Sequence, residues 1–205
     1  LIRDKLLLNH VKDNCVQYVA AKFPEAKNPS ETNRHLYLSH GHTARGLNMV
    51  FKMDTSDFNE KVYDKRLMDH LSEVIYGTDF QQEAKEIHEL TQNGWKVTLF
   101  TNSPIEWAGP IARAIGDDVF VACPGEYMKP EVGAFMQFPL HHTHIYVDDS
   151  LKNLGTARWL KNWHSIYFNE NEKEHKLWCP QVSSMWEFLL YVNSVDQWML
   201  DNHIN

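Results

Sequence analysis

The sequence has 205 residues and is poor in cysteine. Cys15, Cys123 and Cys179 are scattered, odd in number and not spaced as a CxxC metal motif, which favours reduced thiols in the cytoplasm. No stretch approaches the roughly 18 uninterrupted apolar residues of a membrane helix, so no membrane partner is expected. Lys and Arg number 20 against 27 Asp and Glu, a net charge of −7. Such an acidic surface repels phosphate backbones and disfavours binding to a nucleic acid polymer.

The sequence also lacks an initiating methionine. It begins with Leu1 and shows no signal peptide with a basic and then an apolar part. We therefore expect the sequence to begin inside a longer protein. Hydrophobic residues make up 43% and charged residues 23%, ordinary globular values that argue against disorder. The length suits one large domain, or a core with a smaller insert.

The first part of the sequence is predicted to be helical. Apolar residues recur at spacings of three and four between residues 6 and 23, which predicts a helix there. Residues 29–31 (Pro-Ser-Glu) are typical of the start of a second helix. A further helix is expected through Tyr63, capped by Thr55 or Ser56. We assign about residues 1–78 to an α-helical cap.

From about residue 79 the pattern is that of an α/β core. Strands are expected at 95–101, 119–122, 144–147 and 164–168, and helices at 80–90, 103–115, 129–138, 150–162 and 182–200. Strands that alternate with helices predict βαβ units and a Rossmann-like parallel sheet covered on both faces. We therefore expect a core over about residues 79–205. Sites in such sheets lie at the carboxyl ends of the strands.

Polar residues follow these predicted strands. Thr101 and Asn102 follow the first strand, Asp148 and Asp149 follow the third, and Lys129 opens a helix between them. Taken singly, each piece is typical of a helix cap, a solvated lysine or an exposed charge. Together these residues are less typical of caps and exposed charges. Two adjacent carboxylates repel each other and are unfavourable unless a cation offsets their charge. Mg²⁺ prefers one or two carboxylates with water and phosphate, and a hydroxyl and a lysine suit phosphoryl oxygens.

The order and spacing of these residues resembles the haloacid dehalogenase superfamily, whose members are mostly Mg²⁺-dependent phosphatases. Residues 99–102 (Leu-Phe-Thr-Asn) resemble its second motif, and Lys129-Pro130 resembles its third. Residues 146–150 (Tyr-Val-Asp-Asp-Ser) resemble its fourth, with Asn153 where such motifs continue. The resemblance covers nearly the whole chain.

The resemblance implies a role for each of these residues in a phosphatase. Thr101 and Asn102 would bind the phosphoryl group, and Lys129 would orient and neutralise it. Asp149 would ligate Mg²⁺ directly, with Asp148 acting through water or as its partner.

The helical part carries a looser resemblance that bears on the substrate. Residues 40–64 are similar to the cap of the pyrimidine 5′-nucleotidase group. This implies a small phosphorylated metabolite as substrate, such as a nucleoside 5′-monophosphate. Arg45 could reach its base or phosphate, although an arginine in such a place is more commonly a surface ion pair. The physiological substrate and the oligomeric state do not follow from the sequence.

The first motif of the superfamily, Asp-x-Asp, has no counterpart in the sequence. Asp4 is followed two residues later by Leu6, and Asp54 and Asp57 are three residues apart. In the family this motif supplies the nucleophile and the general acid/base. We expect it on a central strand upstream of Leu1, which would leave the chain as written inactive.

Two alternatives stay open. One is a metal-independent haloacid dehalogenase, against which the pair of acids at 148 and 149 argues. The other is a non-catalytic binding protein of the same fold. A zinc site at the histidines of residues 40–42 or 141–144 is a weaker interpretation, because no cysteine or carboxylate accompanies them at ligand spacing.

Overall fold

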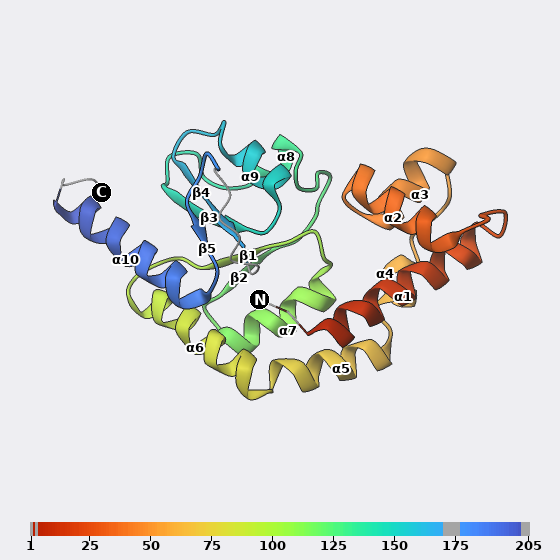
Figure 1. The fold of residues 1–205 in the computed structure, drawn as a ribbon, viewed down its shortest axis with the longest axis horizontal. Helices are drawn as coiled ribbons and strands as arrows, with labels where there is room; N and C mark the ends of the chain where they lie inside the picture. Colours follow the sequence, from red (N-terminus) through yellow and green to blue (C-terminus); the bar gives the residue numbers. More distant parts are fainter. Residues whose placement is uncertain (1, 3, 170–176, 202–205) are drawn as a thin grey trace. The chain divides into compact units, whose positions relative to one another are not determined.

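The structure is a computed structural model that describes residues 2, 4–169 and 177–201 (Figure 1). It mixes helices with short parallel strands, as the α/β prediction requires. The helices are α1 (Lys5–Lys22), α2 (Pro29–His40), α3 (Thr43–Phe51), α4 (Phe58–Val62), α5 (Lys65–Ile75), α6 (Thr78–Gln92), α7 (Ile105–Ile115), α8 (Val132–Phe135), α9 (Leu151–Ala157) and α10 (Met185–Asp201). The strands are β1 (Thr98–Phe100), β2 (Phe120–Ala122), β3 (His144–Asp148), β4 (Trp163–Phe168) and β5 (Gln181–Val182). Within the described part of the chain, no helix has the length and apolarity needed to cross a membrane.

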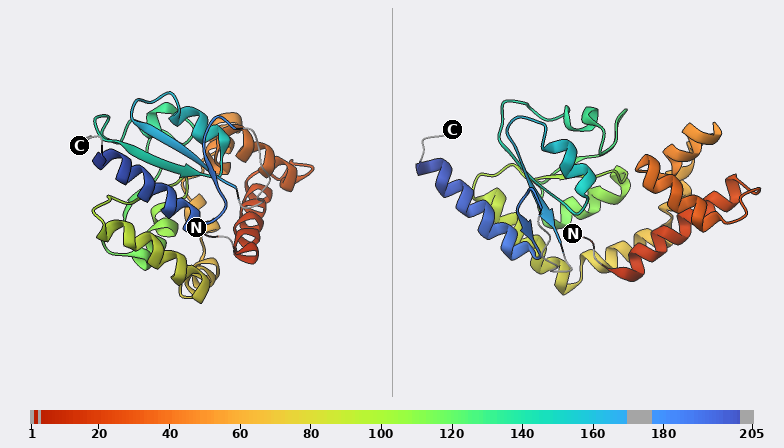
Figure 2. Two further views of the ribbon diagram at one scale, coloured as in Figure 1. Left: turned by 60° about the vertical axis from the view of Figure 1, so that its left-hand side comes forward. Right: turned by 45° about the horizontal axis from the view of Figure 1, so that its top comes forward.

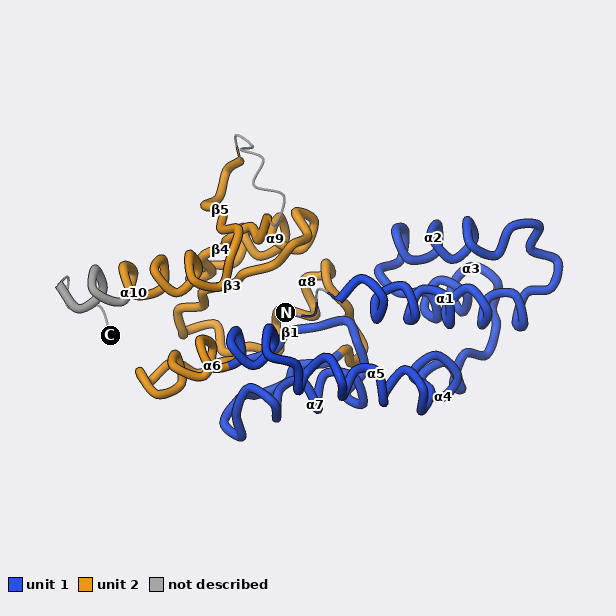
Figure 3. The backbone as a smooth tube through the Cα atoms, turned by 60° about the horizontal axis from the view of Figure 1, so that its bottom comes forward, with its two compact units in different colours: residues 1–84, 98–123 blue, residues 85–97, 124–205 orange. Residues whose placement is uncertain are grey.

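The chain divides into two compact units (Figure 3). Unit 1 comprises residues 1–84 and 98–123, and unit 2 comprises residues 85–97 and 124–205. The chain passes from one unit to the other within α6, before β1 and after β2. The predicted division into an α-helical cap over residues 1–78 and an α/β core over residues 79–205 follows the change of pattern along the sequence and stays a prediction.

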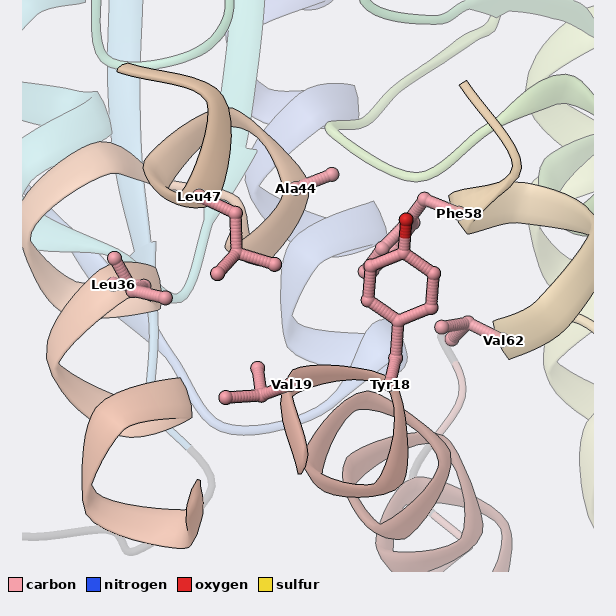
Figure 4. Close-up of a cluster of buried hydrophobic side chains, with 7 residues drawn as sticks. All are labelled: Tyr18, Val19, Leu36, Ala44, Leu47, Phe58 and Val62. Atoms are coloured by element: carbon pink, nitrogen blue, oxygen red, sulfur yellow. The ribbon is translucent and has the colours of Figure 1, made fainter. Parts of the chain in front are cut away.

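The helical part of unit 1 is built around one hydrophobic cluster. Figure 4 shows side chains from α1, α2, α3 and α4 that point toward one another. The cluster consists of Tyr18, Val19, Leu36, Ala44, Leu47, Phe58 and Val62. Since a buried aliphatic or aromatic side chain contributes about 1.5–3 kcal/mol, this cluster holds the four helices together.

Local signals fix where these helices begin and end. The Asp4 carboxylate accepts a hydrogen bond from the Leu7 N–H at 2.7 Å, which caps α1. Gly41 ends α2 with φ at 73°, a conformation that favours glycine. A Cβ on Gly46 would lie 2.8 Å from the Leu36 Cβ, so α2 and α3 approach this closely because residue 46 has no side chain.

The third predicted helix differs from the observed one. α4 starts at Phe58 with Asp57 at its N-cap, and neither Thr55 nor Ser56 caps it. The Asp57 carboxylate is engaged elsewhere. It accepts a hydrogen bond from the Tyr18 hydroxyl at 2.6 Å and pairs with Lys22 at 2.9 Å. Tertiary contacts with α1 therefore replace the local cap.

The strands form two separate parallel sheets instead of the single sheet that the pattern predicted. In unit 1, β1 pairs with β2, with Thr98 opposite Phe120 and Phe100 opposite Ala122. In unit 2, β3 pairs with β4 and β4 with β5, with Asp148 opposite Tyr167. The two sheets thus share the parallel order of the prediction, but the described residues show no continuous Rossmann-like sheet.

Helices α9 and α10 flank the sheet of unit 2 (Figures 1 and 2). Leu154 on α9, Phe135 on α8 and Ile166 on β4 are fully buried and form its centre. The Phe135 ring meets the rings of Tyr146 and Trp163 edge to face, with centroids 5.6 and 5.3 Å away. This packing fixes the end of β3 and the segment before α8, which carry the candidate site.

Candidate functional site

The centre of the candidate site is a buried ion pair in unit 2. Lys129 precedes α8 and Asp148 ends β3, and the Lys129 Nζ lies 2.7 Å from the Asp148 Oδ2. Both side chains are under a tenth exposed, at 9% and 7%. The ammonium also lies 5.6 Å from the centre of the Tyr146 ring, within cation–π range. A lysine buried this deeply is not the solvated surface charge that a lysine before a helix usually is.

Asp148 receives hydrogen bonds from three further groups. The Tyr146 hydroxyl donates to Oδ2, and the Ser150 backbone N–H donates to Oδ1 at 2.8 Å. The Asn153 side-chain amide donates to Oδ1 at 3.1 Å and to Oδ2 at 3.2 Å. Burial, and then the charge of Asp148, raise the pKa of Tyr146, so its hydroxyl keeps its proton and stays a donor. Asp148 therefore anchors β3, α9 and Lys129 to one another.

Asp149 is different from its neighbour. It is exposed at the rim, and no hydrogen bond joins its carboxylate to the side chain of another described residue. Partial burial of the carboxylate, and then the charge of Asp148, raise the pKa of Asp149, while Lys129 opposes this rise. The lysine charge is shared with Asp148, so the rim carries excess negative charge. An exposed carboxylate that accepts no hydrogen bond from another described side chain is a suitable ligand for a cation.

The described residues offer few protein ligands for a metal at this rim. Among the described residues, no three His, Cys, Asp or Glu side chains are grouped so that they could hold a metal ion. Asp149, with Asp148 behind it, offers one or two carboxylates. This is the set that Mg²⁺ accepts when waters and a substrate phosphate complete its shell.

The raised pKa of Asp149 predicts a pH effect on stability. A carboxyl group with a higher pKa in the folded state disfavours folding when ionised, and this penalty disappears as the pH falls through the folded pKa. Asp149→Asn should therefore gain stability relative to the parent chain near neutral pH, and this gain should shrink as the pH falls toward 4. Urea unfolding of both proteins between about pH 4 and pH 7 measures it. A difference that is constant over this range would contradict the assigned pKa shift.

The other predicted phosphate-binding residues lie in unit 1. Thr101 follows β1, and its N–H donates to the Ala122 carbonyl at 3.0 Å, which continues the pairing with β2. The Thr101 Oγ1 accepts a hydrogen bond from the Ser103 N–H at 2.9 Å. The hydroxyl oxygen is thus used as an acceptor, and its proton can be donated to a ligand. Asn102 lies between these two residues and is half-buried.

The structure places the predicted residues in two groups. Lys129, Asp148 and Asp149 lie together at the end of β3 in unit 2. Thr101 and Asn102 follow β1 in unit 1, and Arg45 is half-buried on α3 of the same unit.

Sequence reasoning missed the role of Tyr146. Side chains two residues apart point to the same face of a strand, so the tyrosine at 146 could have been predicted beside the carboxylate at 148. Asn153 was recognised as part of a motif, but its amide contacts with Asp148 were not foreseen.

No protein-family model matches this chain, and no curated protein matches it significantly. The likeness to the haloacid dehalogenase superfamily therefore rests on the three motifs and on their order along the alternating strands and helices.

Proposed function

We propose that this chain is part of a Mg²⁺-dependent phosphomonoester hydrolase of the haloacid dehalogenase superfamily. The observation that carries the proposal is the buried Lys129–Asp148 pair beside the exposed Asp149 at the carboxyl end of β3. A cation and an exposed carboxylate at the end of a parallel strand suit a phosphate and a divalent metal. The proposal includes the finer fold prediction of a Rossmann-like core with an α-helical cap.

Each residue has a chemical role in this proposal. Lys129, held in place by Asp148, presents its ammonium to the phosphoryl group as a point charge. Thr101 donates its hydroxyl proton to a phosphoryl oxygen, because its lone pair already holds the Ser103 N–H. Asn102 adds an amide donor beside it. Arg45 is the candidate for contact with the rest of the substrate.

Asp149 would ligate Mg²⁺ directly, and Asp148 would act through water or as the partner of Asp149. The residues fit this ion, because the rim has one exposed carboxylate, and burial and the charge of Asp148 raise its pKa. When bound, Mg²⁺ would offset the negative charge of the phosphoryl group and of the two acids.

The nucleophile in this proposal is an aspartate that belongs to a strand outside the chain. Its carboxylate would attack phosphorus, the bond to the ester oxygen would break, and water would then release inorganic phosphate. The sheet topology supports this part, since β1 and β3 each pair with only one strand among the described residues. A strand edge with no partner offers backbone groups to a further strand.

The decisive experiment measures release of inorganic phosphate from a panel of nucleoside 5′-monophosphates. It compares this chain with the same chain extended by its native upstream coding sequence, each with Mg²⁺ and with EDTA. The extended protein should release phosphate only with Mg²⁺. This chain alone should release none, because the general acid/base by itself contributes about 10²–10⁴-fold and the covalent step is lost as well.

Other outcomes select the alternatives. Dehalogenation of a 2-haloacid that persists in EDTA would identify the metal-independent dehalogenase. An upstream sequence without Asp-x-Asp, or an extended protein inert on the whole panel, would overturn the phosphatase proposal and favour a binding protein.

A further inference from the structure

Unit 2 contains a cavity at the end of its sheet that lies away from the candidate site. In the pairing of β3 with β4, Asp148 lies opposite Tyr167 at the carboxyl end, and His144 lies opposite Trp163 at the amino end. The cavity is at the amino end and has a volume of about 240 Å³. Its walls include Arg158, Trp163, Ser165, Trp178, Pro180 and Tyr191. The proposed phosphatase chemistry uses none of these six residues.

Pro180 accounts for the cavity. β5 pairs with β4 through Gln181 and Val182, and one residue earlier the Pro180 carbonyl accepts from the Tyr167 N–H at 2.8 Å. In a parallel ladder, the N–H of this position would donate to the Ser165 carbonyl, but proline has no N–H. The pairing therefore ends at Pro180. Before it, the chain of residues 178–180 and the start of β4 form opposite walls of a cavity.

Arg158 gives the cavity a permanent positive charge. Its guanidinium carbon lies 5.0 Å from the centre of the Trp178 ring and 5.8 Å from the centre of the Trp159 ring. Both distances are within cation–π range. Ring faces offer no lone pairs, so these contacts do not occupy the fork of N–H donors. A planar fork of this kind suits a carboxylate, because it can bind both carboxylate oxygens through parallel hydrogen bonds.

The size and the walls of the cavity restrict what can bind beside Arg158. Trp163, Trp178 and Tyr191 supply aromatic surface, which favours an aromatic ring in the ligand. The volume is below the roughly 300–1,000 Å³ of sites for drug-sized ligands, so a single ring fits. Among the described residues that line the cavity, Arg158 alone is permanently charged, which matches a monoanion. We propose that this cavity binds a small aromatic carboxylate, with Arg158 in contact with the carboxylate group.

The first test titrates this chain with benzoate and follows the side-chain N–H resonances of its tryptophans by NMR. A ligand of about nine non-hydrogen atoms should bind with a Kd on the order of 1 mM. Arg158→Gln should raise this Kd about tenfold or more, because hydrogen bonds to a charged group are lost. The control is Arg34→Gln, which changes an exposed arginine of α2 in unit 1 and should leave the Kd unchanged.

The second test uses benzyl alcohol, which keeps the ring and lacks the charge. It should bind more weakly than benzoate, and Arg158→Gln should alter its Kd little. Trp178→Leu should raise the Kd of both compounds about two- to tenfold, since aromatic surface is lost. The matched control is Trp186→Leu, because Trp186 lies outside the cavity walls and is 62% exposed against 41% for Trp178.

Three outcomes would overturn the proposal. The first is the absence of any response to benzoate at about tenfold the expected Kd. The second is an equal Kd for benzoate in the parent and in Arg158→Gln, which would mean that the guanidinium does not contact the carboxylate. The third is tighter binding of phenyl phosphate than of benzoate with the same dependence on Arg158, which would identify a phosphate site. The proposal stands whether or not the extended protein proves to be a phosphatase.

Discussion

Asp148→Asn should lower the free energy of unfolding of this chain by about 3–5 kcal/mol, the usual cost of leaving one charge of a buried pair without its partner. The Lys129 ammonium, which is 9% exposed, would lose the carboxylate that lies 2.7 Å from it. An asparagine at 148 also cannot accept from all four donors, because one of its two terminal groups is itself a donor. Urea unfolding followed by tryptophan fluorescence measures the change.

Asp149→Asn is the matched control for this prediction. It is the same chemical change one residue further along, at an exposed side chain with a raised pKa, and should alter stability by no more than about 0.5 kcal/mol near pH 7. If Asp148→Asn does not fold, the double variant with Lys129→Met removes both charges and should recover part of the loss. Equal effects of the two single substitutions would show that Asp148 does not anchor the pair.

The contrast between Asp148 and Asp149 separates what the sequence predicts from what it does not. The motif at residues 146–150 and the position of the lysine predict two acids and a cation at the ends of strands. The sequence does not distinguish an acid that receives four donors from one that accepts no hydrogen bond from another described side chain. That difference depends on the direction in which each side chain points at the end of β3. It also depends on Asn153 of α9, whose amide donates to Asp148.

The secondary structure was predictable where the signal is local. The start of α2 at Pro29, the end of α6 before Gly94 and the strand before Asp148 follow from proline, glycine and apolar patterning. The elements that were missed are α3, α5 and β5. The two residues of β5 become a strand only because they pair with β4. α3 packs against α2 at Gly46, a contact that periodicity within one segment does not reveal.

The single sheet was predicted on the assumption that alternating strands join one another. Two sheets are observed, because β1 pairs with β2 and β3 pairs with β4 without a strand that bonds to both β1 and β3 among the described residues. Pairing between strands is a non-local property, and a sequence pattern specifies strands more reliably than partners. The position of each polar group after its own strand does not depend on the pairing, so the candidate residues can be named from the sequence, and their common site stays a prediction.

Loss of the Thr101 hydroxyl should have a large effect on catalysis. In the extended protein, Thr101→Val should lower kcat/KM for a nucleoside 5′-monophosphate by about 10²–10³-fold, the usual loss when one preorganised donor to a developing charge is removed. Valine is close to threonine in shape and is well tolerated at the end of a strand, so the fold should persist. The substitution removes both the donor to the phosphoryl oxygen and the acceptor for the Ser103 N–H.

Thr101→Ser is the matched control, because it removes the methyl group of Thr101 and keeps its hydroxyl. Serine keeps the donor and the acceptor, so kcat/KM should stay within about tenfold of the parent, a difference of about 1.4 kcal/mol. Inorganic phosphate, used as a competitive inhibitor, provides a check without turnover and should bind more weakly to the valine variant than to the serine variant. The serine variant keeps the acceptor for the Ser103 N–H and the valine variant does not, so their difference reports on the Thr101 hydroxyl. Equal activity of the two variants would remove Thr101 from the phosphoryl-binding group and leave Lys129 as the principal phosphate contact.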